Sequence, residues 1–119
     1  MATRSTLTIF ADADLSVRVD VKTTDGGASA QTMTGWALAF TIRRTSDNAL
    51  VVSKTTVSGI TIGNGDGTDD RATIAIADTD TTDWPAGQGY KWGLWRTDAG
   101  SDIPLAYGPC IILEASDQP

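Results

Sequence analysis

Residues 34–42 read TGWALAFTI, and this stretch decides the fold class. From position 36 onward, large apolar side chains alternate with small or polar ones: Trp36, Leu38, Phe40 and Ile42 against Ala37, Ala39, Thr41 and Arg43. Successive side chains of a β-strand point to opposite faces, so this period of two predicts a strand with one buried face. Such a strand is typical of an antiparallel sheet that packs on a core.

The same alternation recurs on both sides of this stretch. In residues 16–22 (SVRVDVK) the valines share one face, and in residues 72–77 the inward pair is Ile74 and Ile76. In residues 90–95, Tyr90, Trp92 and Leu94 alternate with Lys91, Gly93 and Trp95. Further strands are predicted at residues 50–54, 60–62 and within 105–115, and residues 7–10 are either a leading edge strand or an arm. With turn residues between them, these segments predict an all-β fold, a single immunoglobulin-like antiparallel β-sandwich of seven to eight strands.

The composition agrees with this fold class and narrows the partners. The 119 residues include 18 Thr and 14 Asp but one Glu and three Lys, which favours strands and turns over helices and fits a single domain. The formal net charge of -6 argues against a nucleic-acid partner, which needs a basic stripe. No apolar run is long enough to cross a membrane, so no membrane partner is expected either. We expect synthesis in a reducing cytoplasm, since Cys110 has no second cysteine to pair with.

The residue types needed for catalysis are scarce. The chain has no histidine, which removes histidine-dependent triads and general bases, and Cys110 stands among apolar neighbours as an inert buried thiol would. We therefore expect neither enzymatic activity nor a cofactor. Residues 64–70 (NGDGTDD) concentrate oxygen ligands in one loop, where calcium binding and a plain solvated hairpin both remain open.

Residues 85–90 (PAGQGY) place a tyrosine at the start of the penultimate strand, just after a corner. In immunoglobulin-like sandwiches, a tyrosine there donates a hydrogen bond back to the corner backbone. Trp84 is expected to plug the same end of the sandwich beside Pro85.

The order of these motifs resembles a known family. It consists of a strand, an Asp-Gly turn at residues 25–26, the Thr-Gly-Trp strand at 34–36, the Gly-Ile-Thr-Ile hairpin at 59–62 and the corner that ends at Tyr90. This order is similar to that in the N-terminal domains of phage baseplate upper proteins and related small virion proteins of tailed phages. The resemblance implies a non-enzymatic virion structural protein, in the first place a capsid decoration (cement) protein that stabilises the head. Its alternatives are a tail, neck or baseplate component, or a carbohydrate-binding adhesion module. The implied partners are the major capsid protein or other virion proteins, in a homo-oligomer located in the virion.

Six residues are candidates for an assembly interface. Trp95 faces away from the inward set of its strand, as an interface anchor would. The apolar residues Leu7, Ile9 and Phe10 lie in residues 1–10, which we expect to be an N-terminal arm or an edge strand outside the sandwich of residues 11–119. Arg43 and Arg44 complete the set. The alternative for residues 7–10 is the first strand of the chain's own sandwich.

Overall fold

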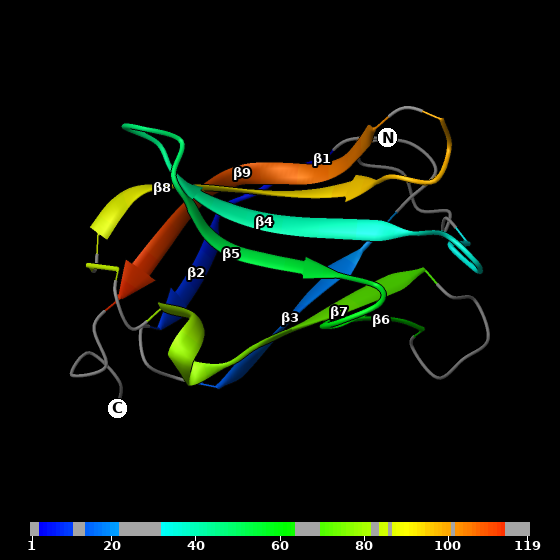
Figure 1. Ribbon diagram of the computed structural model, residues 1–119, viewed down its shortest axis with the longest axis horizontal. Coiled ribbons are helices and arrows are strands. Elements are labelled where there is room, and N and C mark those ends of the chain that lie inside the picture. Colours follow the sequence, from blue (N-terminus) through cyan, green and yellow to red (C-terminus); the bar gives the residue numbers. More distant parts are fainter. Residues whose placement is uncertain are drawn as a thin grey trace.

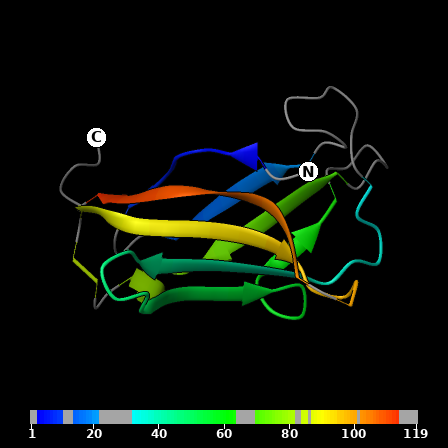
Figure 2. The ribbon, with the colours of Figure 1, turned by 90° about the horizontal axis from the view of Figure 1, so that it is seen from above.

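Two β-sheets pack face to face, as the alternating sequence pattern predicts. The computed structural model describes residues 3–10, 14–21, 32–63, 70–81, 84–85, 87–100 and 102–113. In Figure 1, β9, β8, β4 and β5 lie above β3 and β7, and Figure 2 shows the same layers after a turn of 90°. The larger sheet consists of β1 (Thr3–Arg4), β2 (Leu7–Phe10), β9 (Ile103–Leu113), β8 (Gly87–Arg96), β4 (Leu38–Arg44) and β5 (Leu50–Thr55). The smaller sheet consists of β3 (Leu15–Asp20), β7 (Arg71–Ile76) and β6 (Ile60–Ile62).

Residues 3–10 form an edge strand of the larger sheet. Its two parts, β1 and β2, both pair with β9, and they run parallel to it, whereas the other strand pairs of both sheets are antiparallel. The indole Nε1–H of Trp92 donates to the Ser5 carbonyl oxygen at 3.0 Å, which fixes the break between the two parts. Counted as one interrupted strand, β1 and β2 bring the sandwich to eight strands. The alternative of a projecting arm is wrong for these residues.

The core lies between the sheets on the predicted registers. Leu38, Phe40 and Ile42 of β4 are at most 1% exposed, and the rings of Phe40 and Trp92 lie 6.1 Å apart. The inward registers predicted for residues 38–42, 74–76 and 90–94 are confirmed by their burial. Trp36 differs, because β4 begins only at Leu38. Its ring is half-buried against the core and lies 3.9 Å below the Arg96 guanidinium.

The corner before β8 has the predicted hydrogen bond. The Tyr90 hydroxyl donates to the Pro85 carbonyl oxygen at 2.5 Å, and Trp84 packs partly buried against the same end of the core. Arg44 closes this end from outside, since its guanidinium lies 5.0 Å from the centre of the Trp84 ring.

One 3-10 turn, η1 (Asp78–Thr81), precedes this corner. The Asp80 carboxylate accepts a hydrogen bond from the Ala77 amide at 2.8 Å and pairs with Lys54 at 2.9 Å, while Asp78 donates its amide to Asp14 at 2.7 Å. These contacts anchor the turn. Within the described ranges, no helix has the length and apolarity to span a membrane.

Candidate functional site

The outer face of the larger sheet carries the candidate site, and the strand register determines which residues meet there. Gly93 of β8 lies opposite Thr41 of β4 on one side and Tyr107 of β9 on the other, and Tyr107 is in turn paired with Arg4 of β1. The outward side chains of three strands thus lie in one row around a position that has no side chain. This row is the centre of an open groove.

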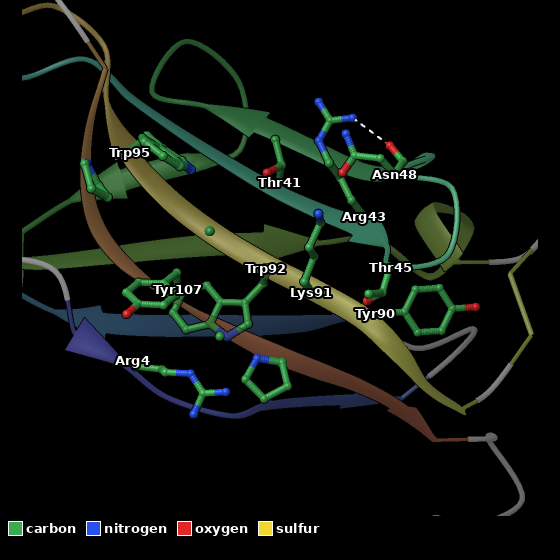
Figure 3. Close-up of a pocket in the computed structure, with 14 residues that line it drawn as sticks. Arg4, Thr41, Arg43, Thr45, Asn48, Tyr90, Lys91, Trp92, Trp95 and Tyr107 are labelled. Carbon is green, nitrogen blue, oxygen red and sulfur yellow. Dashed lines mark hydrogen bonds between the residues drawn. The ribbon is translucent and has the colours of Figure 1, made fainter.

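The groove has a volume of about 720 Å³ and runs along β8. Figure 3 shows Trp95 at one end and Tyr90 at the other, with Arg4 and Tyr107 on one side and Thr41 and Arg43 on the other. The prolines of β9 complete its lining beside Tyr107, namely Pro104 and Pro109. Its shape is that of a shallow contact surface, formed by backbone and by the side chains of neighbouring strands.

Gly93 lets the Trp95 indole lean along the groove. A Cβ atom at Gly93 would lie only 2.7 Å from Trp95 Nε1, so any larger residue would push the indole away. Gly93 is buried beneath this ring, while Trp95 itself remains 37% exposed. Tyr107 is 43% exposed, so two aromatic side chains face solvent across the groove.

The groove is cationic although the chain is acidic. Of the eight Lys and Arg side chains in the described ranges, four form ion pairs with Asp: Arg44, Lys54, Arg71 and Arg96. Three of the other four line the groove: Arg4, Arg43 and Lys91. None of the described Asp residues lines it. The groove therefore has a local charge opposite to that of the whole chain.

Two of these cations are cross-strand partners. Arg43 of β4 lies directly opposite Lys91 of β8, an arrangement in which like charges repel. The Arg43 guanidinium donates one hydrogen bond to the Asn48 carbonyl oxygen at 3.0 Å. Because the carbonyl is neutral, it does not offset the repulsion between the two cations. Binding of an anion beside both side chains would offset it.

Two titratable side chains of β8 and β9 have raised pKa values. Burial raises the pKa of Tyr90 above its ordinary value. The thiol of Cys110 is fully buried away from the groove, and burial raises its pKa to about 12, as expected for an inert thiol.

The predicted interface residues fall into three places. Trp95 and Arg43 meet in the groove. Arg44 lies at the end of the sandwich, where a two-point hydrogen bond to Asp47 at 3.0 and 2.6 Å raises its pKa and lowers that of Asp47 to about 2. Leu7, Ile9 and Phe10 are in β2, the edge strand.

The interface prediction is wrong for Ile9, which is 1% exposed and part of the core. Its register opposite Ile112 of β9 turns its side chain between the sheets. Leu7 is partly buried against the same core. The hydrophobicity of residues 7–10 therefore serves the chain's own folding.

Sequence reasoning missed Arg4, Lys91 and Tyr107 as site residues. The alternation of residues 90–95 does place Lys91 on the outward side with Gly93 and Trp95, and that signal was sufficient to find it. Tyr107 follows two consecutive buried residues, Leu105 and Ala106, so no clean alternation marks its direction. The loop of residues 64–70, for which calcium binding and a solvated hairpin were both open, lies outside the described residues except for Asp70, which is buried. Among the described residues, no group of acidic or thiol side chains is placed to hold a metal ion.

Comparison with solved structures agrees with this arrangement of strands. The second immunoglobulin domain of the mouse polymeric immunoglobulin receptor superposes with a TM-score of 0.51 and 7% sequence identity. The match covers 97% of this chain and 99% of that domain. The fold is immunoglobulin-like. At this identity the likeness concerns the fold alone. No protein-family model and no curated protein matches the chain.

Proposed function

We propose that this protein is a non-enzymatic structural component of a tailed-phage virion, in the first place a capsid decoration protein that stabilises the head. The observation that carries the proposal is the open groove on the outer face of the larger sheet. Trp95, Tyr107 and Arg43 gather there, and Trp, Tyr and Arg are the residue types that dominate binding energy at protein interfaces. The resemblance to small virion proteins supplies the particle on which such a face would act.

The chemistry of the groove supports contact over catalysis. An enzyme that works by acid–base chemistry needs a group whose pKa lies near the working pH, held where a substrate can reach it. The lining of the groove consists instead of aromatic, proline, amide, hydroxyl and permanently cationic groups. These groups bind and orient a partner without changing it chemically.

A small domain with one shallow binding face suits the role of a decoration protein. A groove of this size gives only a moderate affinity, but many copies on a symmetric shell multiply weak contacts into strong retention. The major capsid protein is the proposed partner, and a homo-oligomer of this chain would add further valency. A place in the tail, neck or baseplate would use the same face against a different virion protein.

The test is the protein content and stability of purified virions of the phage that encodes this chain. We expect the protein in wild-type particles, and we expect the purified protein to bind particles that lack it and to raise the temperature at which their heads release DNA. Binding to tails alone would assign the tail, neck or baseplate. Absence from particles, together with failure to bind them, would contradict the proposal.

A carbohydrate-binding adhesion module is the second candidate. It is favoured by the exposed rings of Trp95 and Tyr107, because aromatic faces stack against sugars in such sites. A glycan array with the wild-type protein and Trp95→Ala tests it. Specific binding that is lost in the variant, in a protein absent from virions, would favour this candidate.

A further inference from the structure

We infer that the groove on the outer face of the larger sheet binds an acidic, extended polypeptide segment of the partner. The inference rests on the proposed function for the partner being a protein, and on the groove itself for the partner's charge and shape. Carboxylates of the segment contact Arg4, Arg43 and Lys91, and an apolar side chain of the segment lies between Trp95 and Tyr107.

The charge of the groove favours an anionic partner. The chain carries 15 acidic and 9 basic residues, so a random surface of this protein would be negative. The groove instead has three cations, and in the described ranges no ion pair neutralises any of them. Complementary charge of this kind guides association and selects against basic partners.

The hydrogen-bonding groups of the groove point to the same chemistry. Arg, Lys and Trp side chains donate hydrogen bonds and accept none. Trp95 Nε1–H, Arg4 and Lys91 have no acceptor in the described parts of the chain. A carboxylate is acceptor-only and matches such donors, and Arg binds it with two parallel hydrogen bonds.

The repulsion between Arg43 and Lys91 gives this anion a position. Because the two residues are direct cross-strand partners, one carboxylate above β4 and β8 can contact both side chains. Its binding removes an unfavourable interaction and adds a favourable one. Arg4, across β9, provides a second contact on the opposite side of the groove, as Figure 3 shows.

The dimensions fit an extended chain. The lining residues of β8 run from Tyr90 to Trp95, which at ~3.3 Å per residue is a length of about 17 Å, or about five residues of an extended segment. Trp95, Tyr107 and the two prolines of β9 form the apolar part of the lining, beside its cationic part. An apolar side chain next to acidic ones would use both parts of this surface.

A polypeptide fits the groove better than an acidic polysaccharide. Sugar hydroxyls donate as well as accept, so they need acceptor side chains, and carboxylates are the usual ones. No described residue of the groove has a carboxylate, while its prolines offer apolar contact that sugars use poorly.

The experiment is a titration followed by NMR amide and indole resonances, at low and at moderate salt. The probe is a short glutamate-rich peptide with a central phenylalanine, compared with oligogalacturonate and with a lysine-rich peptide of the same length. The variant is Lys91→Glu. The matched control, Arg18→Glu, makes the same charge change on β3 of the smaller sheet, away from the groove, and neither side chain forms an ion pair among the described residues.

We expect the glutamate-rich peptide to shift the Trp95 indole resonance and the amides of β8, with an affinity that falls as salt rises. The groove variant should bind about tenfold more weakly than the control variant. Equal affinities of the two variants, shifts confined to other surfaces, or no binding at all would overturn the inference. Preference for oligogalacturonate would also overturn it. If the groove variant bound particles as tightly as the wild-type protein does, the inference would be wrong and the proposed function would stand.

Discussion

Single side chains hold one end of this sandwich and its edge strand in place. Tyr90 fixes the corner at one end through the Pro85 carbonyl, and Trp92, two residues further on, fixes the edge strand through the Ser5 carbonyl. Both side chains are buried with the polar atom directed to a backbone acceptor. An aromatic residue in such a position contributes apolar burial and a specific hydrogen bond together.

Replacing Tyr90 by Phe tests the contribution of the corner hydrogen bond. The variant loses one hydrogen bond to a partly buried carbonyl, so we expect the free energy of unfolding to fall by about 1 kcal/mol and the melting temperature by about 4 °C. Thermal unfolding followed by circular dichroism measures this. Tyr107→Phe is the control, because the Tyr107 hydroxyl has no partner among the described residues, and it should melt as wild type does.

The buried thiol predicts a dependence of stability on pH. Burial raises the pKa of Cys110 from 9.0 to about 12, so between these values the unfolded chain loses a proton that the folded chain keeps. Stability should therefore fall as the pH rises through this window, and less so in Cys110→Ala, where other titrating groups are unchanged. Native protein at pH 8 should also fail to react with a thiol reagent that reacts fully after denaturation. Rapid labelling of the native protein would contradict the burial of this side chain.

Among the elements, the interrupted edge strand depends most on a single backbone position. The break between β1 and β2 lies directly beside Gly108 of β9, where an added Cβ would overlap the Ser5 carbonyl oxygen. That carbonyl accepts the Trp92 indole hydrogen bond, and the Ser5 amide donates to the Tyr107 carbonyl at 2.9 Å. The close approach of the two strands therefore requires a glycine on β9.

Gly108→Ala should loosen the edge strand. The methyl group forces β1 away from β9, so we expect a loss of at least about 2 kcal/mol and faster hydrogen exchange at the Ser5 amide. Gly89→Ala on β8 is the control, since a Cβ there meets nothing within 4 Å. A variant at position 108 as stable as this control would show that the strands do not touch there.

The elements also show how far the sequence could predict this structure. Local alternation was sufficient to predict β3, β4, β7 and β8 and their buried faces, because a period of two marks the buried face of a half-exposed strand. The start of β4 was misjudged at Trp36, which precedes the strand and whose ring packs between the edge of the core and the Arg96 guanidinium. The groove was only half predictable. Its outward residues on β8 follow from alternation, but Arg4 reaches Tyr107 only because β1 pairs with β9, and no local pattern encodes the pairing of segments so far apart.

At the scale of the whole molecule, the edge strand links folding to the binding face. Residues 3–10 cover the edge of β9 and also bring Arg4 to the groove. An uncovered edge strand has free backbone groups that pair readily with other chains. The same segment therefore takes the edge position in place of β9 and completes the contact surface.

Deleting residues 1–6 removes β1 and therefore tests the pairing of this strand with β9. The deletion leaves the Trp92 indole without its acceptor, which should cost about 1–3 kcal/mol, and it exposes β9 at Ala106 and Tyr107. We expect a lower melting temperature and concentration-dependent self-association, measured by light scattering after gel filtration. Arg4→Ala keeps the strand and should remain monodisperse to the same degree as wild type. A deletion variant that melts and elutes as the full chain does would contradict the role of β1.

The parallel pairing of β1 and β2 with β9 has a consequence for synthesis on the ribosome. β1 and β2 precede the other described strands and pair with β9, which follows all of them, so the larger sheet cannot close until β9 has left the exit tunnel. Such a long-range pairing slows folding, because the chain must close its longest loop before the contact forms. Until then Leu7 and Ile9 stay uncovered, which leaves the nascent chain open to aggregation and to chaperone binding.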